Sequence, residues 1–194
     1  MPFEVEQKFP ITGDPQPLLQ RISDLGGIRT ETLFQQDLYF NHPVRDFAVT
    51  DEALRIRTID QRNFVTFKGP KLDPHVKTRQ EIEIPLGDGL QTADDFGKML
   101  LQLGFRAVHP VRKQRTIWKL HWQNRDWELA WDEVEGLGTF LEIETITTEQ
   151  SELPTLRDLL LNLAARLNLQ DSERKSYLEM ILEKNRSTGK LPVC

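Results

Sequence analysis

Eight segments of the chain alternate between apolar and polar residues with a period of two, which is typical of strands with two different faces. They span residues 3–9, 30–40, 53–59, 64–68, 76–86, 111–121, 127–132 and 139–147. Turn signals such as Asn41-His42-Pro43 and Gly87-Asp88-Gly89 separate them. Because short loops between successive strands favour antiparallel pairing, the pattern predicts an antiparallel sheet.

Apolar residues with a helical period mark four further segments, which begin near Asp14, Thr92, Ser151 and Tyr177. Asp14 can cap the first helix, and Thr92 with Asp95 resembles a capping pair at the start of the second. Each helix has one apolar face, so each needs a surface to cover. The sequence therefore predicts amphipathic helices packed against a sheet.

A faint repeat relates the two halves of the chain. Glu4-Val5-Glu6 recurs as Glu81-Ile82-Glu83, and each is followed by a loop, a helix, a Leu-Gly pair and another strand. A strand, a helix and three strands, taken twice, give eight strands in two similar halves. We therefore expect an α+β fold, an eight-stranded antiparallel β-barrel that is closed or nearly closed, with the helices packed outside it.

Length and composition restrict the classes of protein that fit. The 194 residues suit one domain, which we place at residues 1–184, followed by a disordered tail at 185–194. With 25 basic and 30 acidic residues the net charge is −5, which argues against a bulk-basic nucleic-acid binder. The single cysteine, Cys194, excludes an internal disulfide framework and a cysteine-based zinc site.

The chain also lacks signals that would take it to a membrane. It has no apolar run of about 18 residues, and its first residues have neither the basic nor the apolar region of a signal peptide. We expect a soluble cytoplasmic protein with no membrane and no nucleic-acid partner. The sequence leaves the oligomeric state open, and a homodimer is compatible with it.

The distribution of charge is more informative than its total. In almost every predicted strand one face is charged and the other is apolar. For a single strand this is the solvated face of an ordinary sheet. If the helices cover the apolar faces from outside, however, the charged faces line the barrel interior. The residues concerned are Lys8, Arg55, Arg57, Lys68, Arg79, Lys113 and Arg115, with Glu4, Glu6, Glu81, Glu83, Asp132, Glu142 and Glu144.

Such an interior cannot be dry and unpaired. Each unpaired buried ion costs several kcal/mol, against a total stability of roughly 5–15 kcal/mol for a domain. The basic residues suit a polyphosphate, whose oxygens arginine and lysine bind well. Carboxylates two residues apart on one strand point the same way and can share a cation. Because no His or Cys cluster accompanies them, oxygen ligation predicts Mg²⁺ or Mn²⁺.

Eight segments together resemble the CYTH superfamily, the triphosphate tunnel metalloenzymes, over about residues 1–184. They are Glu4-Val5-Glu6-Gln7-Lys8, Ala53-Leu54-Arg55-Ile56-Arg57, Thr66-Phe67-Lys68-Gly69-Pro70, Arg79-Gln80-Glu81-Ile82-Glu83, Lys113-Gln114-Arg115, Asp132 with Glu135-Gly136-Leu137-Gly138, Glu142-Ile143-Glu144 and Lys175-Ser176-Tyr177-Leu178. The stretch from Gln36-Asp37-Leu38-Tyr39 to Arg57 looks most like the class IV adenylyl cyclase (CyaB-type) branch. The family's eight-stranded antiparallel tunnel agrees with the barrel predicted above.

The resemblance implies an activity and a set of site residues. The CyaB-type branch makes cyclic AMP and pyrophosphate from ATP, and related branches hydrolyse thiamine triphosphate or inorganic triphosphate. The implied metal ligands are Glu4, Glu6, Asp132, Glu142 and Glu144. The implied catalytic residues are Lys8, Arg55, Arg57, Lys113 and Arg115. These five also bind the triphosphate, together with Lys68, Arg79 and Lys175. For Lys175 two interpretations stay open: it reaches over the tunnel mouth from the C-terminal helix, or it is a solvated helix lysine.

Three functions follow as hypotheses. The leading one is a Mg²⁺- or Mn²⁺-dependent adenylyl cyclase acting on ATP. The second is an inorganic or thiamine triphosphatase, and the third is a module that binds a nucleotide or polyphosphate without turnover. Paired carboxylates argue against the third, because a pure anion binder has little use for them. The preference for a base stays open, as does the choice for Glu81 and Glu83 between metal ligands and ion-pair anchors.

Overall fold

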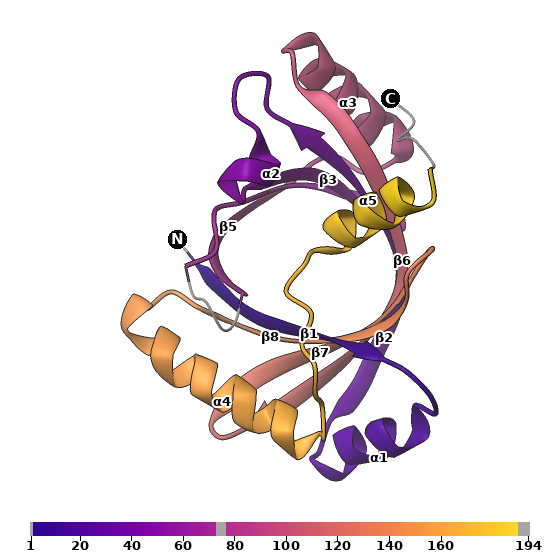
Figure 1. The fold of residues 1–194 in the computed structure, drawn as a ribbon. Coiled ribbons are helices and arrows are strands. Elements are labelled where there is room, and N and C mark those ends of the chain that lie inside the picture. The colour runs from indigo at the N-terminus through magenta and orange to yellow at the C-terminus, as the bar shows by residue number, and fades with distance from the viewer. Residues whose placement is uncertain (1, 73–76, 190–194) are drawn as a thin grey trace.

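The computed structural model describes residues 2–72 and 77–189. Its strands form a closed barrel in the order β1-β5-β4-β3-β2-β6-β7-β8, shown nearly end-on in Figure 1. The strands are β1 (Phe3–Ile11), β2 (Ile28–Asn41), β3 (Ala53–Ile59), β4 (Arg62–Lys68), β5 (Lys77–Pro85), β6 (Arg106–Trp122), β7 (Arg125–Val134) and β8 (Gly138–Thr147). All eight neighbouring pairs are antiparallel, which confirms the predicted barrel.

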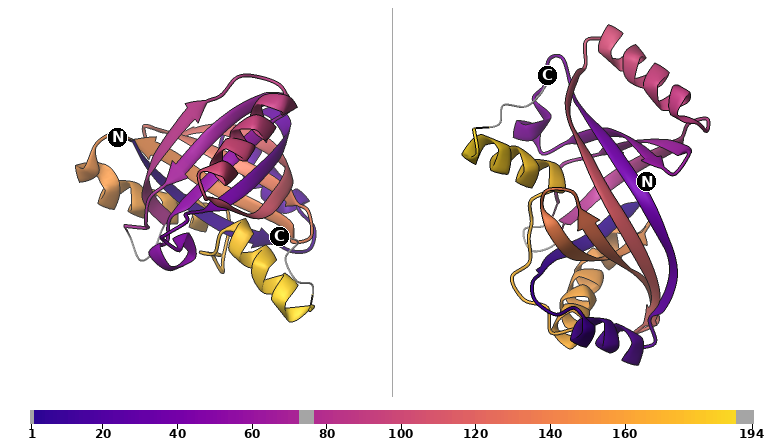
Figure 2. Two further views of the ribbon diagram at one scale, coloured as in Figure 1. Left: turned by 90° about the horizontal axis from the view of Figure 1, so that it is seen from above. Right: turned by 90° about the vertical axis from the view of Figure 1, so that its right-hand side faces the viewer.

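The helices lie outside the barrel, as expected from their amphipathic faces. They are α1 (Gln16–Asp24), α2 (Phe47–Thr50), α3 (Leu90–Gln102), α4 (Leu153–Arg166) and α5 (Tyr177–Ser187), with a 3₁₀ turn at Gln150–Glu152. Figure 2 shows α1 and α4 together at one end of the molecule and α3 at the other. None of the described helices is long and apolar enough to cross a membrane.

The repeated order of elements is also present in the structure. Strand, helix and three strands occur twice, first from β1 to β4 and then from β5 to β8, with the short α2 as an insertion. Gly26 and Gly104 end the two equivalent helices with φ of 89° and 90°. Glycine adopts this conformation without the steric penalty of a Cβ atom, so the two Leu-Gly pairs mark equivalent helix ends.

The largest apolar cluster fixes α4 and α1 to the outer face of the barrel. Leu156, Leu160 and Leu163 of α4 are fully buried in the same cluster as Val5 of β1 and Leu141 of β8. Leu18 and Ile22 of α1 join it. The outward residues of these strands are therefore apolar, and their inward neighbours are left to face the cavity.

Two smaller clusters attach the other helices. Leu100 of α3 packs with Phe40 and Ile56 of the barrel. Tyr177 and Ile181 of α5 pack with residues of β2, β6, β7 and β8, and this cluster places the C-terminal helix beside one mouth of the barrel.

Some local predictions differ from the structure. The helix α2 was not expected, because its four residues are too few to show a period; Asp46 caps it by accepting a hydrogen bond from the amide of Ala48 at 3.1 Å. The capping pair of Thr92 and Asp95 is wrong. The helix already begins at Leu90, so Thr92 lies in its first turn and donates to the carbonyl of Asp88 instead.

The predicted C-terminal boundary of the domain also differs from the structure. The helix α5 continues to Ser187, beyond the boundary that we placed at residue 184. Residues 190–194 of the predicted tail, and residue 76 of the fifth predicted strand, lie outside the described residues.

We predict that Leu160→Ala lowers the free energy of unfolding by about 2–5 kcal/mol, because it leaves a cavity where a fully buried side chain met the barrel. Leu161→Ala is the matched control. Leu161 is 40% exposed on the same helix, so its truncation has a much smaller effect. Urea unfolding measures both, and equal losses would contradict the packing of α4 described above.

Candidate functional site

The barrel encloses a cavity of about 640 Å³ that residues from all eight strands, α2 and α5 line. Eleven of the predicted site residues line it: Glu4, Glu6, Lys8, Arg55, Arg57, Lys68, Arg79, Lys113, Arg115, Glu142 and Glu144. Glu81 and Glu83 line it as well. Asp132 is fully buried behind this surface, and Lys175 lies at the C-terminal segment outside it. The charged faces therefore point inward, as the alternation predicted.

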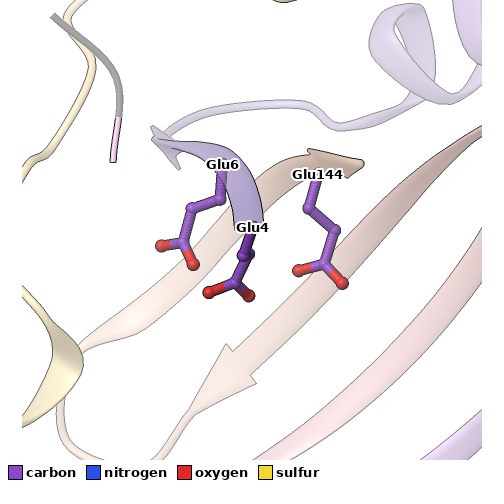
Figure 3. A group of neighbouring side chains, drawn as sticks. All are labelled: Glu4, Glu6 and Glu144. Carbon is purple, nitrogen blue, oxygen red and sulfur yellow. The ribbon is translucent and has the colours of Figure 1, made fainter. Parts of the chain in front are cut away.

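Three carboxylates meet on one wall of the cavity. Glu4 and Glu6 come from β1 and Glu144 from β8, where Glu6 and Glu144 are register partners (Figure 3). One oxygen of each lies within 4.8 Å of the others. Three convergent carboxylates offer the all-oxygen ligands that Mg²⁺ or Mn²⁺ prefers, so this group fits such an ion.

We call Glu4, Glu6 and Glu144 the acidic cluster, and burial changes the pKa of two of its members. Burial raises the pKa of Glu4 to about 8, against the opposing effect of Lys68, and the neighbouring carboxylates add to the rise. Burial also raises the pKa of Glu144 to about 7, with Glu128, Glu142 and Glu6 contributing and Arg115 opposing. Like charges close together in a buried site favour the neutral forms, and a bound cation would reverse that preference.

A second group of charges surrounds Asp132. Its carboxylate accepts hydrogen bonds from Lys113 Nζ at 2.7 Å and from Arg115 Nε and Nη2 at 2.7 and 2.6 Å. The Tyr177 hydroxyl donates to the same carboxylate at 2.9 Å. Glu142 pairs with Arg115 as well. Two of the predicted metal ligands, Asp132 and Glu142, thus lie among cations, apart from the acidic cluster.

Asp37 organises the third group. Its carboxylate accepts from Arg57 Nε and Nη2 at 2.7 and 2.8 Å and from Arg55 Nη1 at 3.2 Å. Burial alone would raise the pKa of Asp37, but the two guanidinium groups outweigh it and hold the pKa below its ordinary value. Within the described part of the chain, Arg55 Nε is buried without an acceptor. A buried donor of this kind suits an anion in the cavity.

Lys68 connects the cationic residues to the acidic cluster. Its ammonium lies 2.5 Å from Glu4 and 2.9 Å from Glu81. Glu81 also lies 3.9 Å from Arg55, and Glu83 accepts from the Thr66 hydroxyl at 2.9 Å. These contacts favour the interpretation of Glu81 as an ion-pair anchor.

The two remaining lysines are held by the C-terminal segment. Lys8 is 1% exposed, and its ammonium donates to the backbone carbonyl of Lys175 at 2.6 Å. The Lys175 side chain instead reaches Glu183 on α5, 2.7 Å away, on the exposed side of the helix. In this structure the backbone carbonyl of Lys175 therefore fixes Lys8, while its ammonium is directed to Glu183 and not into the cavity.

Sequence reasoning did not assign roles to Asp37, Tyr39 or Tyr177. Asp37 and Tyr39 alternate along β2 with Gln35, and all three line the cavity. This alternation could have indicated that Asp37 faces the cavity. No such signal exists for Tyr177, because it lies on a helix whose docking site the sequence does not specify.

Comparisons with known proteins agree with this geometry. The model of the CYTH domain matches residues 2–177. MJ0240 of Methanocaldococcus jannaschii, whose name proposes an adenylate cyclase, is 41% identical over 92% of this chain and 98% of its own length. Adenylate cyclase CyaB of Aeromonas hydrophila is 30% identical over 90% of this chain and 86% of its own. The structure of PH1819 from Pyrococcus horikoshii superposes with a TM-score of 0.80, at 37% identity, over 93% of this chain and 99% of that one.

The raised pKa values predict a pH-dependent stability. In the metal-free protein Glu4 and Glu144 hold protons up to about 8 and about 7, above the ordinary pKa of 4.5. Their contribution to stability is complete below about pH 4.5 and is lost as the pH rises through the folded values. Mg²⁺ or Mn²⁺ binds the ionised forms and therefore flattens this decline.

Urea unfolding across the pH range, with a chelator and with each cation, measures this effect. The double variant Glu4→Gln/Glu144→Gln is the control, since it removes both titrating groups. A decline of the same size in that variant would assign the pH dependence to other residues.

The contacts of Asp37 give a further prediction. Asp37→Asn leaves two buried guanidinium groups without their carboxylate, so we expect a loss of about 3–5 kcal/mol in the free energy of unfolding. Excess tripolyphosphate should restore part of it, because phosphate oxygens replace the missing acceptor. Asp126→Asn, at a side chain that is 93% exposed, is the control and should change little. Thermal unfolding with and without tripolyphosphate measures both, and an Asp37→Asn variant as stable as the control would contradict this assignment.

Proposed function

The chain belongs to the CYTH domain family, and we propose that it is a divalent-cation-dependent adenylyl cyclase that converts ATP to cyclic AMP and pyrophosphate. One observation carries the proposal: a single cavity holds a cluster of three carboxylates and, around it, cationic side chains that suit a triphosphate. The names of two relatives, MJ0240 and CyaB, support the choice of reaction.

The size of the cavity is compatible with a nucleotide. Its 640 Å³ lies within the range of roughly 300–1,000 Å³ that small-molecule sites occupy. Apolar side chains of α5 and β6, Leu178, Leu182 and Val108, line it together with Phe47 of α2. Such a lining can accommodate an organic group in addition to the phosphates, which favours ATP over a bare triphosphate.

The cationic residues would hold the phosphates. We assign this role to Arg55, Arg57, Lys68, Arg79, Lys113 and Arg115. Most already have carboxylate partners at a fixed geometry, so they are positioned before the substrate arrives. Fixed cations around the developing charge of a leaving pyrophosphate stabilise the transition state. Lys8, anchored on the C-terminal segment, would orient the same phosphates from the wall.

The acidic cluster would hold the divalent cation, because one oxygen from each of its three carboxylates converges within 4.8 Å; the cation would compete with Lys68 for Glu4. When bound, the ion neutralises phosphate charge and favours ionisation of an oxygen nucleophile. Asp132 and Glu142, although also predicted as ligands, would act mainly by positioning Lys113 and Arg115.

The proposed reaction is an in-line displacement. The ribose 3′-oxygen forms a bond to the α-phosphorus, and the bond from that phosphorus to the oxygen bridging to the β-phosphorus breaks. Pyrophosphate leaves with the electron pair, and the hydroxyl proton is released to water. The cations bind the departing phosphates throughout, so their attraction grows as the charge on pyrophosphate grows.

Hydrolysis of inorganic triphosphate is the second candidate, and one observation favours it. Ile146, the register partner of Glu4, is 64% exposed, which brings the acidic side of the cavity close to solvent. Water there could attack a terminal phosphorus while the same cations hold the chain. The same charges therefore serve both reactions, and the position of the substrate along the cavity decides between them.

Product analysis with ATP, and separately with tripolyphosphate, tests the proposal in Mg²⁺ and in Mn²⁺. We expect cyclic AMP and pyrophosphate in equal amounts from ATP. The variant Glu4→Gln/Glu6→Gln should lower the rate by at least about 100-fold, because it removes two ligands of the cation. Glu133→Gln, an exposed carboxylate on the outer face of β7, is the matched control and should keep the wild-type rate.

The other outcomes are equally informative. Orthophosphate from tripolyphosphate without cyclic AMP would move the protein to the triphosphatase reaction. Binding of both compounds without any product would show a binding module. An unchanged rate in Glu4→Gln/Glu6→Gln would contradict the assignment of the cation to the acidic cluster.

A further inference from the structure

The first residue of α5 reaches into the charge network of the barrel. Tyr177 is 7% exposed, and its hydroxyl donates to Asp132 Oδ2 at 2.9 Å. Ser176 caps the helix and Glu179 completes a reciprocal capping box, so the start of α5 is fixed at this residue. The C-terminal helix thus donates a hydrogen bond to a carboxylate of β7 that lies 45 residues earlier in the chain.

The atom that Tyr177 contacts is shared with two cations. Asp132 Oδ2 also accepts from Lys113 Nζ at 2.7 Å and from Arg115 Nη2 at 2.6 Å. Asp132 is fully buried, so water does not take part in this competition. The hydroxyl is neutral, and each hydrogen bond that it donates reduces the charge that Oδ2 presents to Lys113 and Arg115.

The ring of Tyr177 is held as firmly as its hydroxyl. Lys8 Nζ lies 4.0 Å from the ring centroid, a cation–π contact, and donates to the carbonyl of Lys175 two residues earlier. The amide of Glu173 donates to the carbonyl of Lys8 at 2.8 Å. The ring also packs edge-on against Phe140 with centroids 5.2 Å apart. The hydroxyl therefore has a defined position relative to Asp132.

We propose that Tyr177 is a positioning residue of the cavity, which acts through Asp132 to set how tightly Lys113 and Arg115 are held away from a bound triphosphate. This rests on the proposed function, in which both cations bind phosphate. Without the hydroxyl, Asp132 holds the two cations more tightly, and a triphosphate must compete for them against a stronger partner. Tyr177 lines the cavity, but its hydroxyl is directed to Asp132, and the proposed effect needs no contact between Tyr177 and the substrate.

Anchoring of α5 is the competing role for Tyr177, and the chain offers a matched control for it. Lys184 Nζ donates to the carbonyl of Gly136 at 2.6 Å and ties the same helix to the turn between β7 and β8. Lys184 is exposed and does not line the cavity. Lys184→Ala therefore loosens the helix without touching Asp132.

The first measurement is the affinity for tripolyphosphate in the absence of metal, by titration calorimetry, for wild type, Tyr177→Phe and Lys184→Ala. Tyr177→Phe removes only the hydroxyl. We expect it to weaken binding about tenfold, the factor typical of one hydrogen bond to a charged group. Lys184→Ala should bind as the wild type does. Equal losses in both variants would show that Tyr177 only anchors the helix and would overturn the proposal.

A double-mutant cycle tests whether the effect passes through Asp132. In an Asp132→Asn background the carboxylate charge is absent, so Tyr177→Phe should change the affinity by less than about twofold. The same tenfold loss in both backgrounds would mean that Tyr177 contacts the ligand directly, which would overturn the proposal. If Asp132→Asn does not fold, Lys113→Met replaces it, and the effect of Tyr177→Phe should shrink there too.

The binding readout separates this proposal from the proposed function. If the effect of Tyr177→Phe on tripolyphosphate binding shrinks in the Asp132→Asn background but ATP gives no cyclic AMP, the cyclase is rejected and the role of Tyr177 stands. If ATP gives cyclic AMP but Tyr177→Phe weakens binding equally in the wild-type and Asp132→Asn backgrounds, only the role of Tyr177 is rejected. A wild-type protein that binds tripolyphosphate neither without metal nor with Mg²⁺ or Mn²⁺ would overturn both.

Discussion

The structure depends on one electrostatic constraint: charges of both signs face the interior of a closed barrel, and each must have a partner there. The outer faces of β1 and β8 are committed to the helices, because α4 and α1 pack their apolar side chains against them. With a side-chain period of two, the remaining positions can only point inward. Burying them is tolerable because carboxylates and cations alternate around the cavity, as at Asp37 with Arg55 and Arg57.

The acidic cluster departs from this alternation, because three carboxylates lie close together there. The carboxylates of Glu4, Glu6 and Glu144 converge. Lys68 lies close to Glu4. The pKa of Glu144 stays raised although Arg115 opposes the rise. Elsewhere one carboxylate is surrounded by several donors, as at Asp132. The wall around the acidic cluster has an excess of negative charge, and the wall around Asp132 has an excess of donors. This separation of negative charge from hydrogen-bond donors within one cavity suits two ligands of opposite charge, a cation and a phosphate.

Much of this could be predicted from the sequence, and the part that could not has a physical reason. Alternation identified the eight strands, their inward faces and most cavity residues, since parity along a strand fixes the face. It does not say which inward carboxylate meets which cation, so Asp132 and Glu144 looked equivalent. Cross-strand register and barrel closure place Asp132 beside Arg115, its partner on β6, whereas Glu144 lies beside Glu6. Periodicity also does not predict the path of residues 168–176. This segment brings Lys175 and Tyr177 into contact with Lys8.

Substrate binding at such a site is an exchange of partners. A phosphate that takes Arg115 leaves Glu142 and Asp132 with fewer donors, and one that takes Lys68 leaves Glu4 and Glu81 without their ammonium. In a buried cavity these carboxylates then need another positive charge, because an unpaired one is costly. On the proposed function a divalent cation supplies it at the acidic cluster. Cation and triphosphate therefore favour each other's binding, and by thermodynamic reciprocity each raises the affinity of the other by the same factor.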